Sequence, residues 1–373
     1  MNLELSVTEQ CNLRCDYCYY RDSHAARKAV MSEDVMEKAV SLAVQRSVEL
    51  NHSFLNITFF GGEPLLRMDF VRETVLFARK VAKLRKKDLP KDFKLNFTVN
   101  TNGTLLTDDI ISYLKREKFS VALSLDGPRN KQDLSRKTID GRGSFNYIAP
   151  YIPALVEMNA AVLMVITPRH VKGFSNAVKW MFKQGFTSVG TSPDFGGKWT
   201  SEDFDALTLE YEKLARFWYT SKLQDRKFYL STIQDKISMA LLDRRQKDYT
   251  CFISSDAIVV ATNGNVFPCS RFISSKKNAP YVMGNVLDEQ SGVYKRMLPK
   301  TISDFIRKDK KECNGCAIRY RCLAHECGCT SFYTTGRLQG VSGEVCAHER
   351  ILCAICDEYA LKLSNKIQVE NLL

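Results

Sequence analysis

Three cysteines near the N-terminus have the spacing of an iron–sulfur site. Cys11, Cys15 and Cys18 follow the pattern C-x3-C-x2-C. Three thiolates in one short loop can bind three irons of a [4Fe–4S] cube and leave the fourth iron open, whereas four cysteines are the ordinary ligand set. A zinc knuckle is the alternative, but it needs a fourth ligand, and the nearest histidine, His24, lies six residues beyond Cys18. This loop alone leaves both metals open.

A second group of cysteines lies in the last third of the chain. Its members are Cys251, Cys269, Cys313, Cys316, Cys322, Cys327, Cys329 and Cys346. Asn263 and Gly264 stand between apolar runs and predict a hairpin turn that brings Cys251 and Cys269 together. The thiolates suffice for two metal sites, and a pair of zinc ribbons has similar spacing. Cys353 and Cys356 are interpreted as part of a helix face, with a redox pair or an extra ligand as alternatives.

The composition is that of an ordered protein with a sizeable core. The 373 residues are 45% hydrophobic and 26% charged, which predicts two or three structural units. No charged segment precedes an apolar run at the N-terminus, and no stretch approaches the roughly 18 apolar residues of a membrane span. We therefore expect a cytoplasmic protein. Thirteen cysteines in that compartment favour metal ligation over disulfides.

The formal charge of +12 raises the question of nucleic-acid binding. Its densest runs are residues 83–87 and 307–311, which are short and lack interleaved aromatic residues. We interpret both as solvated helix ends, with steering of an acidic partner as the functional alternative.

The first half of the chain alternates between strands and helices. Strands are predicted at residues 2–8, 54–60, 94–100, 119–125, 160–167 and 186–191. Six strands joined by mostly helical segments indicate a parallel sheet with right-handed crossovers. About 190 residues are too few for an eight-stranded barrel of about 250. The predicted fold is therefore α/β, a partial (β/α)6 barrel over residues 1–195, followed by a helical bridge (196–250) and a small cysteine-rich domain with a C-terminal helix (251–373).

The polar motifs of this half fall at one edge of the predicted barrel. The cysteine loop and residues 61–64, 101–104 and 124–128 all lie at or just past the C-terminal ends of strands, where β/α barrels build active sites. Each motif alone is typical of a turn. Four of them on one rim predict a shared site.

Together these motifs resemble a radical S-adenosylmethionine (SAM) enzyme. The resemblance rests on the C-x3-C-x2-C loop after the first strand and on Gly61-Gly62-Glu63-Pro64 after the second. It covers roughly residues 1–195, and residues 102–103, 124–127 and 141–145 also fit. It implies that the open iron binds the amino and carboxylate groups of SAM. An electron from the cluster then cleaves SAM to methionine and a 5′-deoxyadenosyl radical, which abstracts a substrate hydrogen.

The resemblance also implies which residues bind SAM. Gly61, Gly62 and Glu63 are expected at the amino group. Ser124 and Arg136 are candidates for the carboxylate, because a guanidinium fork matches that group, although Arg136 on the surface is the alternative.

Three further residues belong to this predicted cofactor site. Tyr17 is expected beside the cluster or the adenine, unless it is ordinary core. Asp126 either binds the ribose or caps the Asp-Gly-Pro turn, and Asn102 lies on the same rim.

The C-terminal cysteines resemble a SPASM domain, which holds two auxiliary [4Fe–4S] clusters. The resemblance assigns Cys313, Cys316, Cys322 and Cys346 to one, the four-cysteine cluster. It assigns Cys251, Cys269 and Cys327 to the other, the three-cysteine cluster. The chain departs from the family by having four residues, not three, between Cys322 and Cys327. Cys329 is thus a possible closing ligand, and an open iron is the alternative.

Most family members with this extension modify peptides or proteins. The resemblance therefore implies an oxidoreductase that cross-links or oxidises a side chain of a ribosomally made precursor peptide. It would use SAM, three [4Fe–4S] clusters and a low-potential electron donor of the flavodoxin or ferredoxin type, without nucleic acid or membrane. A small molecule or a sulfatase-type protein is the alternative substrate, although sulfatase-maturing members carry an Asp base where this chain has Ser270. A non-catalytic zinc or nucleic-acid-binding module is the distant alternative, and no catalytic residue is assigned.

Overall fold

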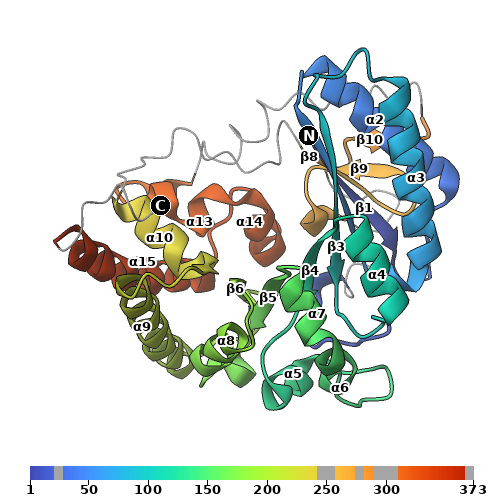
Figure 1. The fold of residues 1–373 in the computed structure, drawn as a ribbon. Coiled ribbons are helices and arrows are strands. Elements are labelled where there is room, and N and C mark those ends of the chain that lie inside the picture. The colour runs from blue at the N-terminus through green and yellow to red at the C-terminus, as the bar shows by residue number, and fades with distance from the viewer. Residues whose placement is uncertain (21–27, 242–256, 274–280, 289–309, 366–373) are drawn as a thin grey trace. The chain divides into compact units, whose positions relative to one another are not determined.

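A computed structural model describes residues 1–20, 28–241, 257–273, 281–288 and 310–365 of the chain (Figure 1). Its packing separates two compact units. The first comprises Met1–Ser124, Arg136–Met158 and Phe252–Ile302, and the second comprises Leu125–Ser135, Asn159–Cys251 and Ser303–Leu373. The predicted domain boundaries at residues 195 and 250 do not coincide with the limits of these two packing units. The division into a barrel, a bridge and a cysteine-rich domain stays a prediction.

The first unit contains a mainly parallel sheet built around β1. Its strands, in sheet order, are β10 (Gly284–Asn285), β9 (Asn265–Phe267), β8 (Ala257–Val260), β1 (Asn2–Thr8), β2 (Phe54–Gly61), β3 (Lys94–Thr101) and β4 (Ser120–Ser124). Neighbours from β8 to β4 are parallel, and β9 and β10 are antiparallel. Leu3, Leu5 and Val7 are fully buried, as expected for one face of a central strand with a side-chain period of two.

Helices α2, α3 and α4 lie along one face of this sheet (Figure 1). Ser32 Oγ accepts a hydrogen bond from Val35 N (3.4 Å) and Thr107 Oγ1 accepts one from Ile110 N (3.2 Å), so both helices begin at a local N-cap. The helical segments of this unit are α2 (Glu33–Glu49), η1 (Pro64–Arg67), α3 (Met68–Leu84), α4 (Asp108–Arg116), α6 (Phe145–Ile148), η2 (Ala149–Tyr151), α7 (Ile152–Glu157) and η4 (Ser270–Phe272).

The second unit has three parallel strands and longer helices. The strands are β5 (Ala161–Ile166), β6 (Ser188–Pro193) and β7 (Tyr229–Leu230). The helical segments are α5 (Arg129–Ser135), η3 (Pro168–His170), α8 (Phe174–Lys183), α9 (Ser201–Leu223), α10 (Ser231–Leu241), η5 (Lys311–Cys313), η6 (Arg319–Arg321), α13 (Leu323–Glu326), α14 (Gly328–Thr335) and α15 (Gly343–Ser364).

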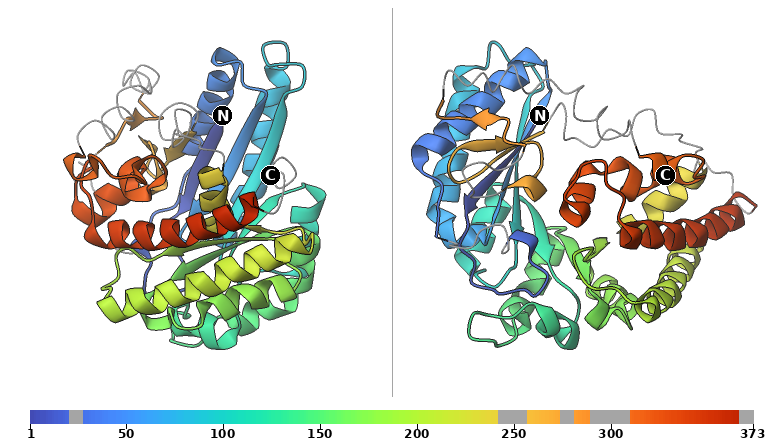
Figure 2. Two further views of the ribbon diagram at one scale, coloured as in Figure 1. Left: turned by 90° about the vertical axis from the view of Figure 1, so that its left-hand side faces the viewer. Right: turned by 180° about the vertical axis from the view of Figure 1, so that it is seen from behind.

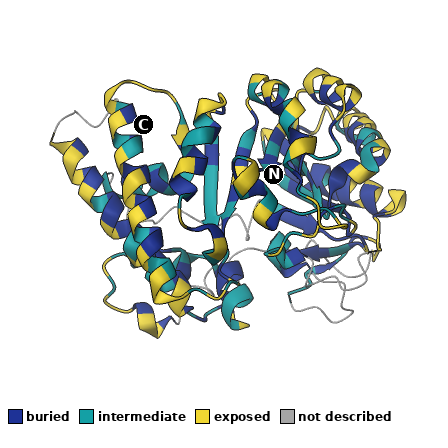
Figure 3. Cartoon of the chain, turned by 90° about the horizontal axis from the view of Figure 1, so that it is seen from below, coloured by how far each residue is buried: buried dark blue, intermediate teal, exposed yellow. Residues whose placement is uncertain are grey.

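Helix α15 forms the centre of the helical packing in the second unit. It packs against α9 and α10, and Figure 2 shows it in red alongside α9. Cys353 and Cys356 are completely buried on it, and burial raises the pKa of the Cys353 thiol to about 11 and that of the Cys356 thiol further. Both lie on a buried face of this helix, which supports the interpretation made from the sequence. In Figure 3 the strands carry mainly buried and intermediate residues, while the helices carry stripes of exposed ones.

Most predicted elements are found within a few residues of their expected positions. The predicted hairpin turn joins β8 and β9, with Gly264 at φ +84°, whereas Cys251 lies outside the described residues. The predicted last strand starts two residues late, at Ser188. The helical bridge is interrupted, because β7 pairs with β6 through Ser188 and Tyr229. Within the described ranges, no helix is long and apolar enough to cross a membrane.

One residue of the basic run 307–311 contradicts the interpretation of that run as a solvated helix end. Lys310, expected on a solvated helix end, is only 3% exposed. The interpretation was wrong for this residue because a lysine can be buried when its ammonium group finds local acceptors, which sequence spacing does not reveal.

Candidate active site

The N-terminal cysteine loop is held by its own main chain and by residues 136–138. Leu13 N donates to Cys11 Sγ (3.4 Å), and Cys18 N donates to Cys15 O (3.3 Å). On the other side, Arg14 N donates to Lys137 O (2.7 Å), and Leu13 forms an antiparallel bridge with Thr138. The three thiols are partly exposed, so they remain accessible to a cluster. No three His, Cys, Asp or Glu side chains in the described part of the chain converge on a single metal ion.

Gly61 and Gly62 lie directly against the main chain that leads into this loop. A Cβ atom at Gly61 would stand 2.3 Å from Thr8 O, and one at Gly62 would stand 2.0 Å from Gln10 O. Gly62 N donates to Thr8 O (2.7 Å), and Glu63 N donates to Gln10 O (2.8 Å). Only glycine fits this close approach, which brings two of the predicted motifs together.

The Glu63 carboxylate connects the ends of β2 and β3. It is 1% exposed. Its Oε1 accepts hydrogen bonds from Thr101 Oγ1 (2.7 Å) and Leu65 N (3.1 Å), and its Oε2 accepts one from Asn102 N (2.7 Å). Burial raises its pKa to about 7, although these three donors lower it. The Glu63 side chain thus stabilises the loops that follow β2 and β3. Contact of residues 61–63 with SAM stays a prediction.

Asn102 joins the end of β3 to the cysteine loop. Its Nδ2 donates to Asn12 Oδ1 (3.0 Å) and lies 3.9 Å from Cys11 Sγ, while its Oδ1 accepts from Thr104 N (2.9 Å). A hydrogen bond to a ligand sulfur is one of the factors that set the potential of an iron–sulfur cluster. The structure therefore places this residue in direct contact with a predicted ligand.

Tyr17 and Arg136 also meet at the cysteine loop. Arg136 is 6% exposed, so the surface alternative is wrong, and its guanidinium carbon lies 5.3 Å from the centre of the Tyr17 ring. This is a cation–π distance. Ser124 ends β4 directly after Leu123, the register partner of Thr101, which places it at the same sheet edge as Asn102. The SAM contacts of these residues stay predictions.

Asp126 belongs to the second unit and stabilises its own turn. It is fully buried, its N donates to Gln132 Oε1 (2.8 Å), and its Oδ1 accepts from Val165 N (3.1 Å). Gly127, at φ +129°, would place a Cβ 2.7 Å from Ala177 Cβ. These contacts support the turn interpretation, and the ribose contact stays a prediction.

Sequence reasoning missed a polar cluster on the second face of β1. Its members are Glu4, Ser6, Tyr19, Tyr20, Ser270 and Arg271. Tyr20 Oη lies 2.5 Å from Ser6 Oγ, and the Arg271 guanidinium carbon lies 5.4 Å from the centre of the Tyr19 ring. The available signal was the alternation of polar Asn2, Glu4, Ser6 and Thr8 in a strand predicted to be central.

Glu4 is the unusual group of this cluster. Burial raises the pKa of its carboxyl to about 7, and a hydrogen bond with Ser270 lowers it only in part. Burial raises the pKa of Tyr19, and the charge of the neighbouring Glu4 raises it further. A carboxyl with a pKa near neutrality can take up and release a proton at physiological pH.

The residues assigned to the four-cysteine cluster all lie in the second unit. Burial raises the pKa of the Cys313 thiol, Lys310 lowers it, and the neighbouring Cys316 and Cys346 raise it again, so these three thiols interact electrostatically. Cys316 N donates to Cys313 O (3.1 Å). Cys322 is 5% exposed and packs in a cluster with Val345, the residue before Cys346. The donor set fits an iron–sulfur cluster.

The described residues assigned to the three-cysteine cluster belong to different units. Cys269 is the N-cap of η4 in the first unit. Cys327 is the N-cap of α14 in the second unit, where its Sγ accepts from Thr330 N (3.4 Å) and Thr330 Oγ1 (3.2 Å). Cys329 is 1% exposed on the same helix. This assignment, including Cys251 and the closing ligand, stays a prediction.

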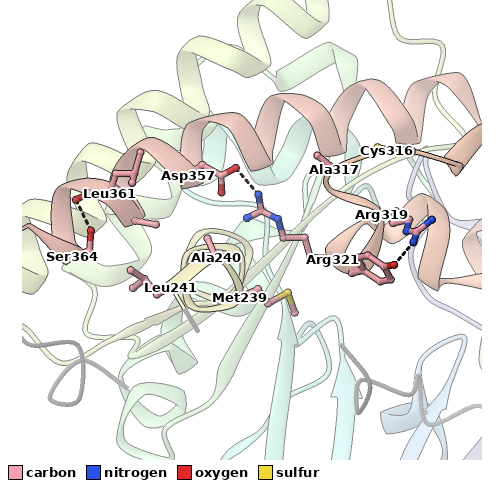
Figure 4. Close-up of a pocket in the computed structure, with 13 residues that line it drawn as sticks. Met239, Ala240, Leu241, Cys316, Ala317, Arg319, Arg321, Asp357, Leu361 and Ser364 are labelled. Carbon is pink, nitrogen blue, oxygen red and sulfur yellow. Dashed lines mark hydrogen bonds and ion pairs between the residues drawn. The ribbon is translucent and has the colours of Figure 1, made fainter. Parts of the chain in front are cut away.

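An open pocket of about 810 Å³ lies in the second unit between α10 and α15 (Figure 4). Cys316, Arg319 and Arg321 contribute to its wall. Arg321 Nη2 is paired with Asp357 of α15 at 2.5 Å. None of the residues predicted to bind SAM lines this pocket, so its position does not bear on the cofactor site.

Solved structures show the same fold. Native anSMEcpe with bound AdoMet superimposes with a TM-score of 0.77, covering 98% of this chain and 100% of that chain at 20% identity. The same protein with bound AdoMet and Cp18Cys peptide gives a TM-score of 0.75 over 99% of this chain and 100% of that chain at 21% identity. The predicted α/β class, a partial barrel followed by a cysteine-rich region, is confirmed.

Sequence comparison extends the likeness. The chain is 26% identical over 326 residues to the cysteine-type anaerobic sulfatase-maturating enzyme of Clostridium novyi, covering 83% of each chain. Residues 251–317 match the SPASM model, an iron–sulfur cluster-binding domain. Residues 5–207, more than half of the chain, match the model of the radical SAM superfamily. This chain therefore belongs to the radical SAM superfamily, and cofactor binding at its partly exposed cysteine loop, where Gly62 lies against the main chain and Asn102 against Cys11, stays a prediction.

Proposed function

We propose that this radical SAM and SPASM enzyme modifies a ribosomally made peptide, by cross-linking or oxidising one of its side chains. The observation that carries the proposal is the union of the cysteine loop and its glycine rim with a second cysteine-rich region. The relatives that this chain resembles over most of its length include the Clostridium novyi sulfatase-maturating enzyme and anSMEcpe, which was solved with a peptide bound. A peptide is therefore the substrate class that the likeness favours.

The cofactors follow from the cysteine sets. Cys11, Cys15 and Cys18 would hold one [4Fe–4S] cluster with SAM, and the C-terminal cysteines would hold two more. When bound, SAM and its cluster supply the radical chemistry that removes a hydrogen atom from the substrate. The protein supplies position: Asn102 orients Cys11, and Gly62 lets β2 approach the loop. Arg136 with Ser124 would bind the SAM carboxylate, with Tyr17 beside the cluster and Asp126 at the ribose.

The first unit offers a proton acceptor for the oxidised substrate. Removal of a hydrogen atom followed by loss of an electron leaves a proton to be taken up. Glu4 can accept it, because burial raises the pKa of its carboxyl to about 7 and Ser270 lies within hydrogen-bonding contact. The electrons would leave through the auxiliary clusters, and the reducing electron would come from a flavodoxin-type or ferredoxin-type donor in the cytoplasm.

Maturation of a sulfatase-type protein is the second candidate. It is favoured by the name of the Clostridium novyi relative and opposed by Ser270, which replaces the Asp that the resemblance implies for that reaction. A small-molecule substrate is the remaining alternative.

The test compares these substrates directly. The reconstituted enzyme is incubated anaerobically with SAM, reductant and either the product of a neighbouring short reading frame or a cysteine-containing sulfatase peptide. A peptide product that has lost two hydrogen atoms, with 5′-deoxyadenosine formed alongside, supports maturation. An aldehyde on the sulfatase peptide supports the second candidate. Turnover without any peptide refutes both.

Iron analysis tests the cofactors independently. Three clusters correspond to about twelve irons per chain. An iron content of about four, or zinc alone, contradicts the assignment of the C-terminal cysteines. Variants Cys11→Ala, Cys15→Ala and Cys18→Ala should form no 5′-deoxyadenosine.

A further inference from the structure

Lys310 is a buried cation in the cysteine-rich part of the second unit. It is 3% exposed. Its Nζ donates to Ala324 O (2.6 Å) and to Ser331 Oγ (2.8 Å). In the described part of the chain, no carboxylate lies within 4.0 Å of this ammonium group. The side chain is therefore held by neutral acceptors.

These contacts join three segments that carry predicted cluster ligands. Lys310 O accepts from Cys313 N (2.9 Å). Ala324, which accepts from the ammonium group, stands two residues after Cys322. Ser331 Oγ, the other acceptor, also lies 3.1 Å from Cys327 O. One residue thus contacts segments assigned to both auxiliary clusters.

Cysteine sulfurs are the main neighbouring groups that favour the charged form of Lys310. An ammonium group buried without an opposite charge is costly. Burial lowers the pKa of Lys310, and the neighbouring Cys313, Cys327 and Cys322, ahead of Glu326, raise it only in part. Thiolates bound to iron keep their negative charge, and net charge around a cluster is one determinant of its reduction potential. A fixed positive charge favours the reduced, more negative cluster.

We propose that Lys310 positions the segments of Cys313 and Cys322, which are assigned to the four-cysteine cluster, and raises the reduction potential of that cluster. The inference rests on the auxiliary-cluster assignment made under Proposed function. A higher potential makes the cluster a better electron acceptor, which suits a reaction in which the substrate is oxidised.

The experiment uses the full chain with Cys11, Cys15 and Cys18 replaced by alanine, so that remaining iron signals come from the C-terminal cysteines. Three variants are added to this background. Lys310→Met removes the charge, Lys310→Arg keeps it, and Lys311→Met is the matched control, because Lys311 is the neighbouring lysine and is exposed. Iron and sulfide are measured per chain, and potentials are measured by anaerobic titration followed by electron paramagnetic resonance.

The charge-free variant should show a lower potential or less auxiliary iron. We expect Lys310→Met to lower the potential of the four-cysteine cluster by about 60 mV, which is a tenfold change in a one-electron equilibrium. Lys310→Arg should shift it in the same direction by less, and Lys311→Met should match the parent. Loss of iron in Lys310→Met alone supports the positioning role. If Lys310→Met does not fold, Ser331→Ala removes one acceptor and should lower the potential by a smaller amount.

Two results would overturn the proposal, and a third would overturn the auxiliary-cluster assignment on which it rests. Parent-like potentials and iron content in Lys310→Met refute it, as does an equal shift in Lys311→Met. If the triple-cysteine background itself binds no iron, the auxiliary-cluster assignment fails and Lys310 is not the cause.

Discussion

Replacing Glu349 with glutamine is expected to destabilise the folded chain by about 3 kcal/mol at neutral pH. Glu349 lies on α15 with its side chain 2% exposed, and its Oε2 is 2.7 Å from Lys236 Nζ of α10. The same oxygen accepts from Leu323 N (2.7 Å), and Lys236 Nζ also donates to Arg321 O. This buried ion pair therefore binds the main chain on both sides of Cys322.

The magnitude follows from the pKa of the carboxyl. Burial alone would raise it, but the hydrogen bond from His348 and the charge of Lys236 outweigh burial and lower the pKa from 4.5 to about 2. That difference corresponds to about 3 kcal/mol. Breaking a buried ion pair by removing one partner costs about 3–5 kcal/mol, so the two estimates agree. Since the folded-state pKa is depressed, this stability is present above pH 4.5 and is lost as the pH falls toward 2.

Thermal unfolding of the iron-free protein measures the effect. With an unfolding entropy of about 2.1 cal/mol/K per residue, 3 kcal/mol lowers the Tm of the whole chain by about 4 °C. The matched control is Glu358→Gln on the same helix, because Glu358 is 61% exposed and pairs with exposed Lys362. An exposed pair of this kind contributes little to stability, because water screens it.

Two outcomes would refute the reasoning about Glu349. One is a Glu349→Gln protein as stable as the Glu358→Gln control at pH 7. The other is a difference between parent and variant that stays constant as the pH is lowered from 5 toward 2. The double variant Lys236→Met with Glu349→Leu should recover part of the loss, because it leaves no unpaired buried charge.

Three further predictions concern the first unit. Gly62→Ala should abolish iron binding by the cysteine loop, because its Cβ would meet Gln10 O at 2.0 Å, whereas Gly343→Ala, with nothing within 4 Å, should retain iron. Asn102→Ala loses three side-chain hydrogen bonds of about 1 kcal/mol each and its contact with Cys11, so 5′-deoxyadenosine formation should slow and the EPR signal of that cluster should shift; an unchanged spectrum would argue against the contact. Glu4→Gln should remove a step near pH 7 from the pH–rate profile. Because the folded-state pKa of Glu4 is raised from 4.5 to about 7, the parent loses stability as the pH rises through this window, and Glu4→Gln should not; equal slopes for both proteins would contradict that pKa.

The features predicted correctly are those whose physical cause is local in the chain. The hairpin turn at Asn263 and Gly264 joins neighbouring strands, with Gly264 at φ +84°, so its signal can be read directly. The C-x3-C-x2-C loop and Gly61-Gly62 are also short motifs. The two glycines approach the main chain that leads into the loop without any side-chain contact. Arg136 was left between a cofactor contact and the surface, because its burial against Tyr17 depends on a return of the chain 119 residues later.

The polar groups that only the structure revealed depend on contacts between distant segments. Glu63 reaches Thr101 and Asn102, 38 and 39 residues away, and Glu349 reaches Lys236 across 113 residues. Burial decides what such groups do: it moves the pKa of Glu4 to about 7, and it holds Lys310 away from water in a run that reads as a solvated helix end.

By itself, the sequence determined the candidate ligand atoms and the strand ends beside them, because thiol spacing and strand periodicity are properties of neighbouring residues. Tertiary structure decided which charges are buried and what they face. The cost of removing a charge from water depends on every segment that surrounds it, and those segments come together only in the folded chain.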